Sequence, residues 1–346
     1  MSYTTINKST EHFNTKLYTG NGSARSITGV GFQPDWVWVK DRSDAQNHGL
    51  RDAVRGATKR LVSNDNAAEN TQTQGLSSFD SDGFSLGTGV DVNANSDNYV
   101  SWNWKANGAG SANTDGSINS TVSANTTAGF SIVSYTGTGA NATVGHGLGV
   151  APKLLILKSR TRSDGQWTVG SDMLGWSKFL YLDANSAEQT FNLYQNTAPT
   201  SSVFYLSGDG GVNQSGGNMI GYAFAEKVGY SKFGSYTGGG SSFPFIYTGF
   251  KPAWVMVKVT NDGDNWHIID NKRDSFNTMD SHLFANLNTV ETTDSSYYFD
   301  MLSNGFKPRS TNNAFNASTK PYVYMAFAEN PFVANDSGTV VPSTAR

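Results

Sequence analysis

The chain of 346 residues contains no cysteine, which excludes disulfides, thiolate metal ligands and cysteine nucleophiles together. Charge is also scarce. Only 15% of the residues are charged, the net charge is −3, and no long run of lysine or arginine occurs. The chain therefore lacks the basic surface by which proteins bind nucleic acid, and we expect no nucleic-acid partner.

Long hydrophobic runs are missing as well. No stretch of about 18 apolar residues could span a bilayer, and residues 1–30 carry no apolar segment of the secretion-signal type. We expect no transmembrane segment, no membrane insertion and no cleaved signal peptide. What is abundant is glycine (37 residues), Asn, Ser, Thr and aromatic residues (12%). This mixture is typical of short strands joined by tight turns, and it predicts an all-β protein.

The sequence repeats one pattern three times. A Tyr-Thr-Gly triplet stands at 18–20, 135–137 and 236–238, and each is followed by a proline that opens an apolar stretch ending in lysine. These stretches run from Pro34 to Lys40, from Pro152 to Lys158 and from Pro252 to Lys258. The prolines are 118 and 100 residues apart, which is the size of a whole small domain rather than of a solenoid turn.

Each repeat has an opening and a closing strand of different character. The opening stretches at 36–39 and 154–157 are apolar at every position, which predicts strands covered on both faces. In the closing strands the large side chains alternate, so that one face enters a core. That face is formed by Val100, Trp102 and Trp104, by Ile220, Tyr222 and Phe224, and by Val323, Met325 and Phe327. Trp36 and Trp254 of the opening strands are also expected in a core.

These patterns predict three tandem antiparallel β-sandwich domains of the jelly-roll or lectin-like type. We assign them to residues 1–105, 129–229 and 230–334. Residues 106–128 are small and polar, which predicts a flexible or extended linker, and residues 335–346 are expected to form a C-terminal arm.

Catalytic and metal-binding signals are weak. No two of the five histidines have the spacing of a helical zinc pair. His48 precedes Asp52 and His267 precedes Asp270, as a general base and an orienting carboxylate could, but the second repeat lacks this pair, so structural hydrogen bonds are favoured. Asp80-Ser81-Asp82-Gly83 lacks the rest of a calcium loop and is interpreted as a solvated turn. We predict no catalytic residue, no metal and no cofactor.

Aromatic residues outside the strand cores are the best ligand candidates. Trp167, Trp176 and Trp266 follow the opening strands, and the polar residues Asp164, Asp172, Asp264 and Asn265 lie near them in sequence. Sugars stack on aromatic faces while Asn and Asp side chains hydrogen-bond their hydroxyl groups. We predict glycan stacking at Trp167, Trp176 and Trp266, assisted by Asp172 and Asn265; a structural role at the edge of a sandwich is the alternative.

Three runs carry a resemblance to a known kind of domain. They are residues 123–133 (Ser-Ala-Asn-Thr-Thr-Ala-Gly-Phe-Ser-Ile-Val), 145–153 (Gly-His-Gly-Leu-Gly-Val-Ala-Pro-Lys) and 326–332 (Ala-Phe-Ala-Glu-Asn-Pro-Phe). They resemble an uncharacterised repeated domain found in tail-fibre and other virion structural proteins of marine tailed bacteriophages, and the resemblance covers nearly the whole chain. It implies a virion surface protein built from lectin-like β-sandwiches, and it carries over no catalytic residue.

Three functions follow as expectations. The first is a non-enzymatic structural protein of the virion, assembled in the host cytoplasm as a homo-oligomer on capsid or tail proteins. Because the chain has no sustained heptads and no Gly-X-Y tract, a capsid decoration, a tail-surface protein or one segment of a composite fibre is favoured over a self-sufficient fibre. The second is an adhesin that binds a host surface glycan, and the third is a polysaccharide depolymerase.

Overall fold

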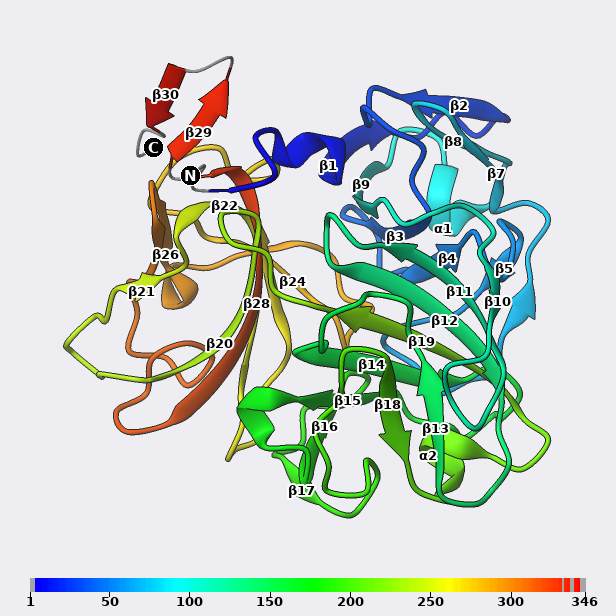
Figure 1. Ribbon diagram of the computed structural model, residues 1–346. Helices are drawn as coiled ribbons and strands as arrows, with labels where there is room; N and C mark the ends of the chain where they lie inside the picture. Colours follow the sequence, from blue (N-terminus) through cyan, green and yellow to red (C-terminus); the bar gives the residue numbers. More distant parts are fainter. Residues whose placement is uncertain (1–3, 332, 337–338, 343–346) are drawn as a thin grey trace.

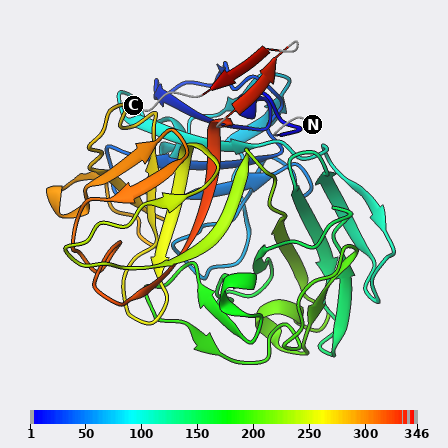
Figure 2. The same ribbon diagram turned by 60° about the vertical axis from the view of Figure 1, so that its left-hand side comes forward.

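The computed structural model describes residues 4–331, 333–336 and 339–342. Within these residues the protein is all-β, with several antiparallel sheets and only two α-helices of four residues each. The chain forms three lobes around a common centre, coloured blue to cyan, green, and yellow to red along the sequence (Figures 1 and 2). We call them the first segment (4–105), the second segment (106–229) and the third segment (230–331). Among the described residues, no helix has the length and apolar character needed to cross a membrane.

The first segment contains two sheets and a short strand pair. Its elements are η1 (Ser9–Glu11), β1 (Phe13–Thr19), β2 (Arg25–Thr28), β3 (Trp36–Asp41), β4 (Gly49–Asp52), β5 (Lys59–Arg60), β6 (Asn70–Thr71), β7 (Leu76–Asp80), β8 (Gly83–Leu86), α1 (Val90–Asn93) and β9 (Asn98–Trp104). The strand orders are β1-β9-β3-β4, β2-β8-β7 and β5-β6.

The second segment has a larger main sheet. Its elements are β10 (Ser111–Asn113), β11 (Ser120–Asn125), β12 (Phe130–Thr136), β13 (Ala142–Gly145), β14 (Leu154–Ser159), β15 (Thr168–Ser171), η2 (Asp172–Leu174), β16 (Lys178–Tyr181), β17 (Gln189–Thr190), β18 (Val203–Leu206), α2 (Gly210–Asn213) and β19 (Asn218–Phe224). The main sheet has the order β10-β11-β12-β19-β14-β15-β16-β17, and β13 pairs with β18.

The third segment and the C-terminal strands complete the chain. Their elements are β20 (Ser231–Thr237), β21 (Ile246–Tyr247), β22 (Phe250–Val259), β23 (His267–Asp270), β24 (Ser281–Phe284), β25 (Thr292–Thr293), η3 (Ser295–Tyr297), β26 (Phe299–Leu302), β27 (Gly305–Pro308), β28 (Pro321–Pro331), β29 (Val333–Asp336) and β30 (Thr339–Pro342). The sheets have the orders β20-β28-β22-β23-β24-β25 and β21-β27-β26.

One strand order recurs in all three segments. The strand that ends in Tyr-Thr pairs with the closing strand, which pairs with the opening strand, which pairs with the strand after it. The series are β1-β9-β3-β4, β12-β19-β14-β15 and β20-β28-β22-β23. This shared order lets positions in one segment be matched to those in the others by register.

The Tyr-Thr-Gly triplets hold the end of the sheet to a short turn. The hydroxyl groups of Tyr18, Tyr135 and Tyr236 donate hydrogen bonds to main-chain carbonyls at 2.9, 2.6 and 2.7 Å. The glycine that follows lies against the same turn. A Cβ on Gly137 would stand 2.2 Å from the carbonyl oxygen of Gln214, and the other two triplets have the same close approach. Only glycine fits there.

The largest hydrophobic core joins the three segments. All nine large residues of the closing strands belong to it, together with Trp36 and Trp254, as does Trp167. The rings of Trp36 and Tyr222, which come from different segments, stack with centroids 4.3 Å apart. The predicted core positions are therefore confirmed, but the face they form packs against the other two segments rather than inside one sandwich.

A separate, smaller core lies on the other side of each main sheet. Val37 and Val39 point into that of the first segment, Leu155 and Leu157 into that of the second, and Val255 into that of the third. The opening strands are thus covered on both faces, as their uninterrupted apolar sequence predicts.

The expected linker at 106–128 is part of a sheet. Within it β10 pairs with β11, and β11 pairs with β12 along its whole length, from Ser120 opposite Tyr135 to Asn125 opposite Phe130. Small polar residues suit β10, which is the edge strand of this sheet and whose residues are exposed or half-buried. The expected C-terminal arm includes Asn335 and Asp336 of β29 and the whole of β30, two strands that pair antiparallel, while residues 337–338 and 343–346 lie outside the described residues.

Candidate functional site

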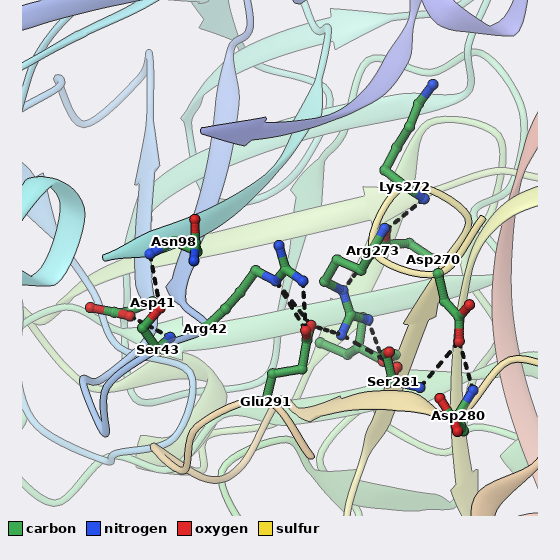
Figure 3. Close-up of polar contacts among 12 residues, drawn as sticks. Asp41, Arg42, Ser43, Asn98, Asp270, Lys272, Arg273, Asp280, Ser281 and Glu291 are labelled. Atoms are coloured by element: carbon green, nitrogen blue, oxygen red, sulfur yellow. Dashed lines mark hydrogen bonds and ion pairs between the residues drawn. The ribbon is translucent and has the colours of Figure 1, made fainter. Parts of the chain in front are cut away.

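The joint between the first and third segments is built on Glu291. Arg42 reaches it from the first segment, with Nη2 at 2.6 Å and Nε at 3.1 Å from its carboxylate, and Arg273 reaches it from the other side at 2.8 Å (Figure 3). Arg273 also binds Asp270, at 2.5 Å. The two arginines lower the pKa of Glu291 against the opposing effect of its burial, so its carboxylate is ionised at neutral pH.

The joint between the second and first segments repeats this arrangement. Glu69 accepts hydrogen bonds from Arg160 of the second segment at 2.8 and 2.9 Å and from Arg55 of its own segment at 3.0 Å. Arg55 in turn binds Asp52 at 2.5 Å. The same pattern of two arginines and two carboxylates thus holds two of the three joints. The three segments together form a closed ring, with a joint between each pair.

The joint between the third and second segments uses main-chain hydrogen bonds instead. The backbone N–H of Glu188 donates to the Thr260 carbonyl at 2.6 Å, and that of Asp264 donates to the Asn185 carbonyl at 2.9 Å. Thr260 stands where Arg42 and Arg160 stand in the other segments, two residues after the lysine that ends the opening run.

The predicted stacking residues Trp167 and Trp266 lie at two of these joints. They occupy matching positions, immediately before β15 and β23, and are 0% and 2% exposed. Trp167 Nε1 donates to the Val62 carbonyl of the first segment at 2.7 Å, and Trp266 Nε1 donates to the Tyr181 carbonyl of the second at 2.8 Å. Both rings are covered by protein and link neighbouring segments.

His48 takes the matching position in the first segment. Its Nδ1 accepts from Trp38 Nε1 at 2.7 Å, so the ring proton resides on Nε2, which donates to the Leu287 carbonyl of the third segment at 3.1 Å. Burial lowers the pKa of His48 well below its usual value and keeps the ring neutral. Asp52 is not its partner; that carboxylate accepts from Arg55 and from Tyr222.

The other predicted residues fall in two places. Trp176, 3% exposed, donates its ring N–H to Asp172 at 2.7 Å, and Lys153 binds the second oxygen of that carboxylate at 2.6 Å. Asn265 accepts from the amide of Asn286 at 2.8 Å. The structure therefore brings Trp176 and Asp172 together and places them apart from Trp167 and Trp266. Glycan stacking at these residues stays a prediction.

The turn considered for calcium is held by protein donors. The two carboxylate oxygens of Asp82 accept the backbone N–H groups of Gly31 and Gly29 at 2.7 and 2.9 Å. Asp80 accepts from Ser78 and Ser85, both at 2.7 Å. Over the described part of the chain, no group of three or more His, Asp or Glu side chains is arranged to hold a metal ion.

The second segment has an open cavity of about 450 Å³ between the loop after β14 and the start of α2. Its lining includes the aromatic residues Phe179, Tyr181 and Phe191 and the charged residues Arg162, Asp164 and Asp209. Phe191 is 56% exposed, so more than half of its surface is open to solvent. An aromatic face beside charged hydrogen-bonding groups is the combination that holds sugars and other polar ring compounds.

The polar wall of this second-segment cavity is fixed by local contacts. Arg162 makes a fork-like pair with Asp164 at 2.9 and 3.0 Å. Its guanidinium lies over Gly210, where a Cβ would stand 2.5 Å from Nη1. Asp209 caps the short helix α2 by accepting from the Gly211 N–H at 2.7 Å. Hydrogen bonding and charge from Arg162 lower the pKa of Asp164, so this carboxylate is ionised at neutral pH and can only accept hydrogen bonds.

The first segment has a cavity of about 400 Å³ at the matching place. The pairing of β5 with β6 and of β16 with β17 shows which residues of the two cavities correspond. Lys59 pairs with Thr71 as Lys178 pairs with Thr190, so Arg60 and Gln72 of the first segment correspond to Phe179 and Phe191 of the second. The first-segment cavity is lined by Arg60, Gln72 and Asp91, and Asn288 of the third segment borders it. The aromatic wall of one cavity is thus replaced by charged and amide groups in the other.

The matching place in the third segment is filled by aromatic and histidine side chains. His267 and His282 stand where Thr168 and Phe179 stand in the second segment, as the pairing of His267 with Phe284 indicates. Ring centroids of His267 and Phe315 are 4.8 Å apart, and those of His282 and Tyr297 are 5.2 Å apart. Burial lowers the pKa of both histidines, so they pack as neutral rings.

Sequence reasoning missed most of the residues that line the cavities. The sequence points to Asp164 through its place near Trp167, but nothing in the local sequence points to Phe191, Arg162, Arg60 or Asp91. The signal was present in the comparison of the repeats. Positions that correspond by strand register but carry different residue types line the cavities. Positions that correspond and carry the same residue type, such as the Tyr-Thr-Gly triplets, hold the fold.

Comparison with known proteins gives a family and no function. No curated protein matches the chain, and no solved structure does. Residues 8–331 match one protein family, described as Domain of unknown function (DUF7483). That match runs through all three segments without a break, so the family unit is the whole ring. The chain belongs to the DUF7483 family.

Proposed function

We propose that the chain is a non-enzymatic structural protein on the surface of a tailed bacteriophage particle, built from three tandem lectin-like β-sandwiches. The observation that carries this proposal is the closed ring: three segments share one core, and every pair of segments is joined by hydrogen bonds or ion pairs. Such a body is already assembled within one chain, which suits a part that must keep its shape on a particle.

The resemblance of the three sequence runs to phage virion domains is the reason for proposing a phage particle as the location. Within that proposal the partners are capsid or tail proteins and further copies of this chain, as a capsid decoration or as part of the tail or a fibre. Electron cryo-microscopy of the purified particle tests it. Density with the outline of the three-lobed ring on the capsid lattice or on the tail supports the proposal, and absence of the chain from purified particles by mass spectrometry overturns it.

The second-segment cavity favours a second candidate function, binding of a host surface glycan. A sugar ring stacked on Phe191 would lie in the same cavity as Arg162 and Asp209, whose side chains can hydrogen-bond sugar hydroxyl groups. Hydrolysis is less well supported, because a glycosidase needs one carboxyl with a raised pKa and the pKa of Asp164 is lowered.

A glycan array tests this second candidate. The purified protein is compared with Phe191→Ala and with Phe276→Ala, a matched control because Phe276 is 78% exposed and lies outside the cavity. Loss of a glycan signal in Phe191→Ala alone supports the cavity as the site. Equal signals in all three proteins, or no signal in any, contradict it.

A further inference from the structure

The first-segment cavity has a charge that its own residues do not balance. Arg60 lines the cavity, and the buried Arg51 lies close to Arg60: a Cβ on Gly49 would stand 2.5 Å from Arg51 Nη1 and 3.6 Å from Arg60 Nε. They share a single carboxylate, Asp91, at 3.1 Å from Arg51 Nη2 and 3.4 Å from Arg60 Nε. Two guanidinium groups against one carboxylate leave one positive charge beside the cavity.

Asp91 has no capacity left for further neutralisation. Its Oδ1 accepts from the Gln72 amide at 2.7 Å, and its Oδ2 faces both arginines. Gln72 Oε1 accepts from Arg51 as well. The carboxylate and the amide are therefore already used in holding Arg51 in place.

Arg51 is a buried group with unpaired donors. The side chain is 0% exposed, and its Nε and Nη1 atoms have no hydrogen-bond partner in the described structure, nor has Arg60 Nε a partner of hydrogen-bond geometry. Buried guanidinium donors are normally paired, since leaving a buried donor without a partner forfeits its hydration with nothing in return. Burial is the main cause that lowers the pKa of Arg51; Asp91 raises this pKa, and the like charge of Arg60 lowers it further.

The cavity beside this pair suits more than a small ion. Its volume of about 400 Å³ is in the range of pockets that take small organic ligands. Arg60 and Asp91 form the charged part of its wall, and the amide side chains of Gln46, Asn47 and Asn288 are among its other lining groups. Amides donate to and accept from hydroxyl groups, whereas a guanidinium matches the planar fork of a carboxylate or the oxygens of a sulfate.

We propose that this first-segment cavity binds an acidic saccharide, with the anionic group of the sugar beside Arg60 and its hydroxyl groups on the amide wall. The proposal shares glycan binding with the second candidate function but concerns a different cavity, so each can fail alone. It also gives the two cavities distinct ligands: an acidic sugar on the first segment and a sugar that stacks on Phe191 on the second.

Titration of the full chain with four probes tests the proposal. Isothermal titration calorimetry and saturation-transfer NMR are run with methyl β-glucuronide, glucose 6-sulfate, methyl β-glucoside and sodium acetate. We expect the glucuronide, the sulfate or both to bind, the neutral glucoside to bind at least tenfold more weakly, and affinity to fall as salt is raised. Which acidic sugar binds more tightly distinguishes carboxylate from sulfate recognition.

Variants locate the binding. Arg60→Gln removes the positive charge at the cavity wall and is expected to weaken binding of the acidic sugar at least tenfold, while Arg60→Lys restores part of it. Arg25→Gln removes an equal charge elsewhere in the same segment, on a side chain that contacts the Thr19 carbonyl, and should leave binding unchanged. Circular dichroism and the unfolding midpoint confirm that each variant is folded.

Three results would overturn the proposal. They are equal binding of the neutral and acidic sugars, undiminished binding by Arg60→Gln, and binding of acetate as tight as that of the glucuronide, which would reduce the site to a simple anion site. If Phe191→Ala abolishes binding of a neutral glycan but spares the acidic sugar, both cavities bind independently. If no neutral glycan binds and the acidic sugar does, the second candidate function fails and the present proposal stands.

Discussion

At the scale of single residues, three lysines are buried at the ends of apolar strands. Lys40, Lys158 and Lys258 end the three apolar runs and are each 0% exposed. Their ammonium groups donate to main-chain carbonyls, and in one case across a joint, from Lys158 to Asn66 of the first segment at 2.9 Å. Burial lowers the pKa of each lysine to about 8. The recurring lysine is therefore a frame residue that ties loops to the sheet.

His48 makes the stability of the protein depend on pH. Its folded-state pKa lies well below the unfolded value near 6.5, so the unfolded chain binds more protons as pH falls below 6.5. The stability contributed by the neutral ring is complete above that pH and is lost as pH falls toward the folded pKa. We expect the free energy of unfolding to decline as pH falls below 6.5, with a slope from this group of at most about 1.4 kcal/mol per pH unit.

Urea unfolding of the wild type and of His48→Gln, measured from pH 7.5 to 5, checks this expectation. Glutamine retains an acceptor and a donor but does not titrate, so the variant should show the shallower slope. His267 and His282 titrate in both proteins and do not affect the difference. Glu69 and Glu291, whose pKa values are lowered, lose their contribution only below about pH 4.5. Identical slopes would show that His48 is not a neutral buried ring.

At the scale of elements, the sequence predicted strands better than their partners. The alternating Val100, Trp102 and Trp104 pattern indicates which face of β9 is buried, and this was confirmed. It could not indicate that the face packs on two other segments, because alternation reports burial and not the identity of the covering surface. For the same reason the polar run at 106–128 was assigned to a linker, although a polar edge strand has the same composition.

The cavities were the least predictable part. Arg51 and Asp91 are charged residues 40 positions apart, and nothing in their local sequence marks them as a buried pair. Trp167 and Trp266 stand outside the alternating strands, which makes them ligand candidates by sequence, but in the structure both lie at joints between segments. A large aromatic residue in a loop is equally suited to a ligand and to a neighbouring segment.

The Glu291 joint should be a large single contribution to stability. Glu291→Gln leaves Arg273, which is 0% exposed, without one of its charge-assisted partners, and Arg42 without its bidentate pair. Removing one partner of a buried ion pair costs about 3–5 kcal/mol. Glu11→Gln is the matched control, because its salt bridge with Lys8 is largely exposed and worth at most about 1 kcal/mol. Urea unfolding curves of the two variants measure the difference, and similar losses would contradict a special role for the joint.

The glycine of the second Tyr-Thr-Gly triplet should not tolerate a methyl group. In Gly137→Ala the new Cβ would meet the Gln214 carbonyl oxygen, and separating β12 from the turn after α2 should cost about 1–3 kcal/mol. Gly263→Ala is the comparison, since a Cβ there has no neighbour nearer than 3.7 Å. Thermal unfolding should place Gly137→Ala well below the wild type and Gly263→Ala close to it. A reversed order would argue against the close approach.

At the scale of the whole molecule, the shared core makes the segments interdependent. Trp36, Tyr222 and Trp254 come from three different segments and lie in one cluster. A segment removed from the other two would expose its share of this cluster to water. Exposing apolar surface costs about 25 cal/mol of free energy per Å². The three sandwiches of the proposal are therefore repeats in sequence that fold as one unit.

Calorimetry tests this interdependence. We expect a single unfolding transition for the full chain, with equal calorimetric and van't Hoff enthalpies. Phe224→Ala, in the second segment, should lower the midpoint of that one transition, because Phe224 packs against Phe327 of the third segment with ring centroids 6.1 Å apart. Two or more resolved transitions, of which Phe224→Ala shifts only one, would show that the segments unfold independently.

The ring also has a consequence for how such a protein changes over generations. In a ring of three identical chains, every mutation is present three times, and a residue introduced to suit one cavity is imposed on the other two. Here each segment is encoded by its own stretch of sequence. A mutation can therefore alter one of three sites without the others: the charged first-segment cavity, the aromatic second-segment cavity, or the place in the third segment that aromatic side chains fill. A single gene thus keeps one rigid frame while three positions on it diverge independently.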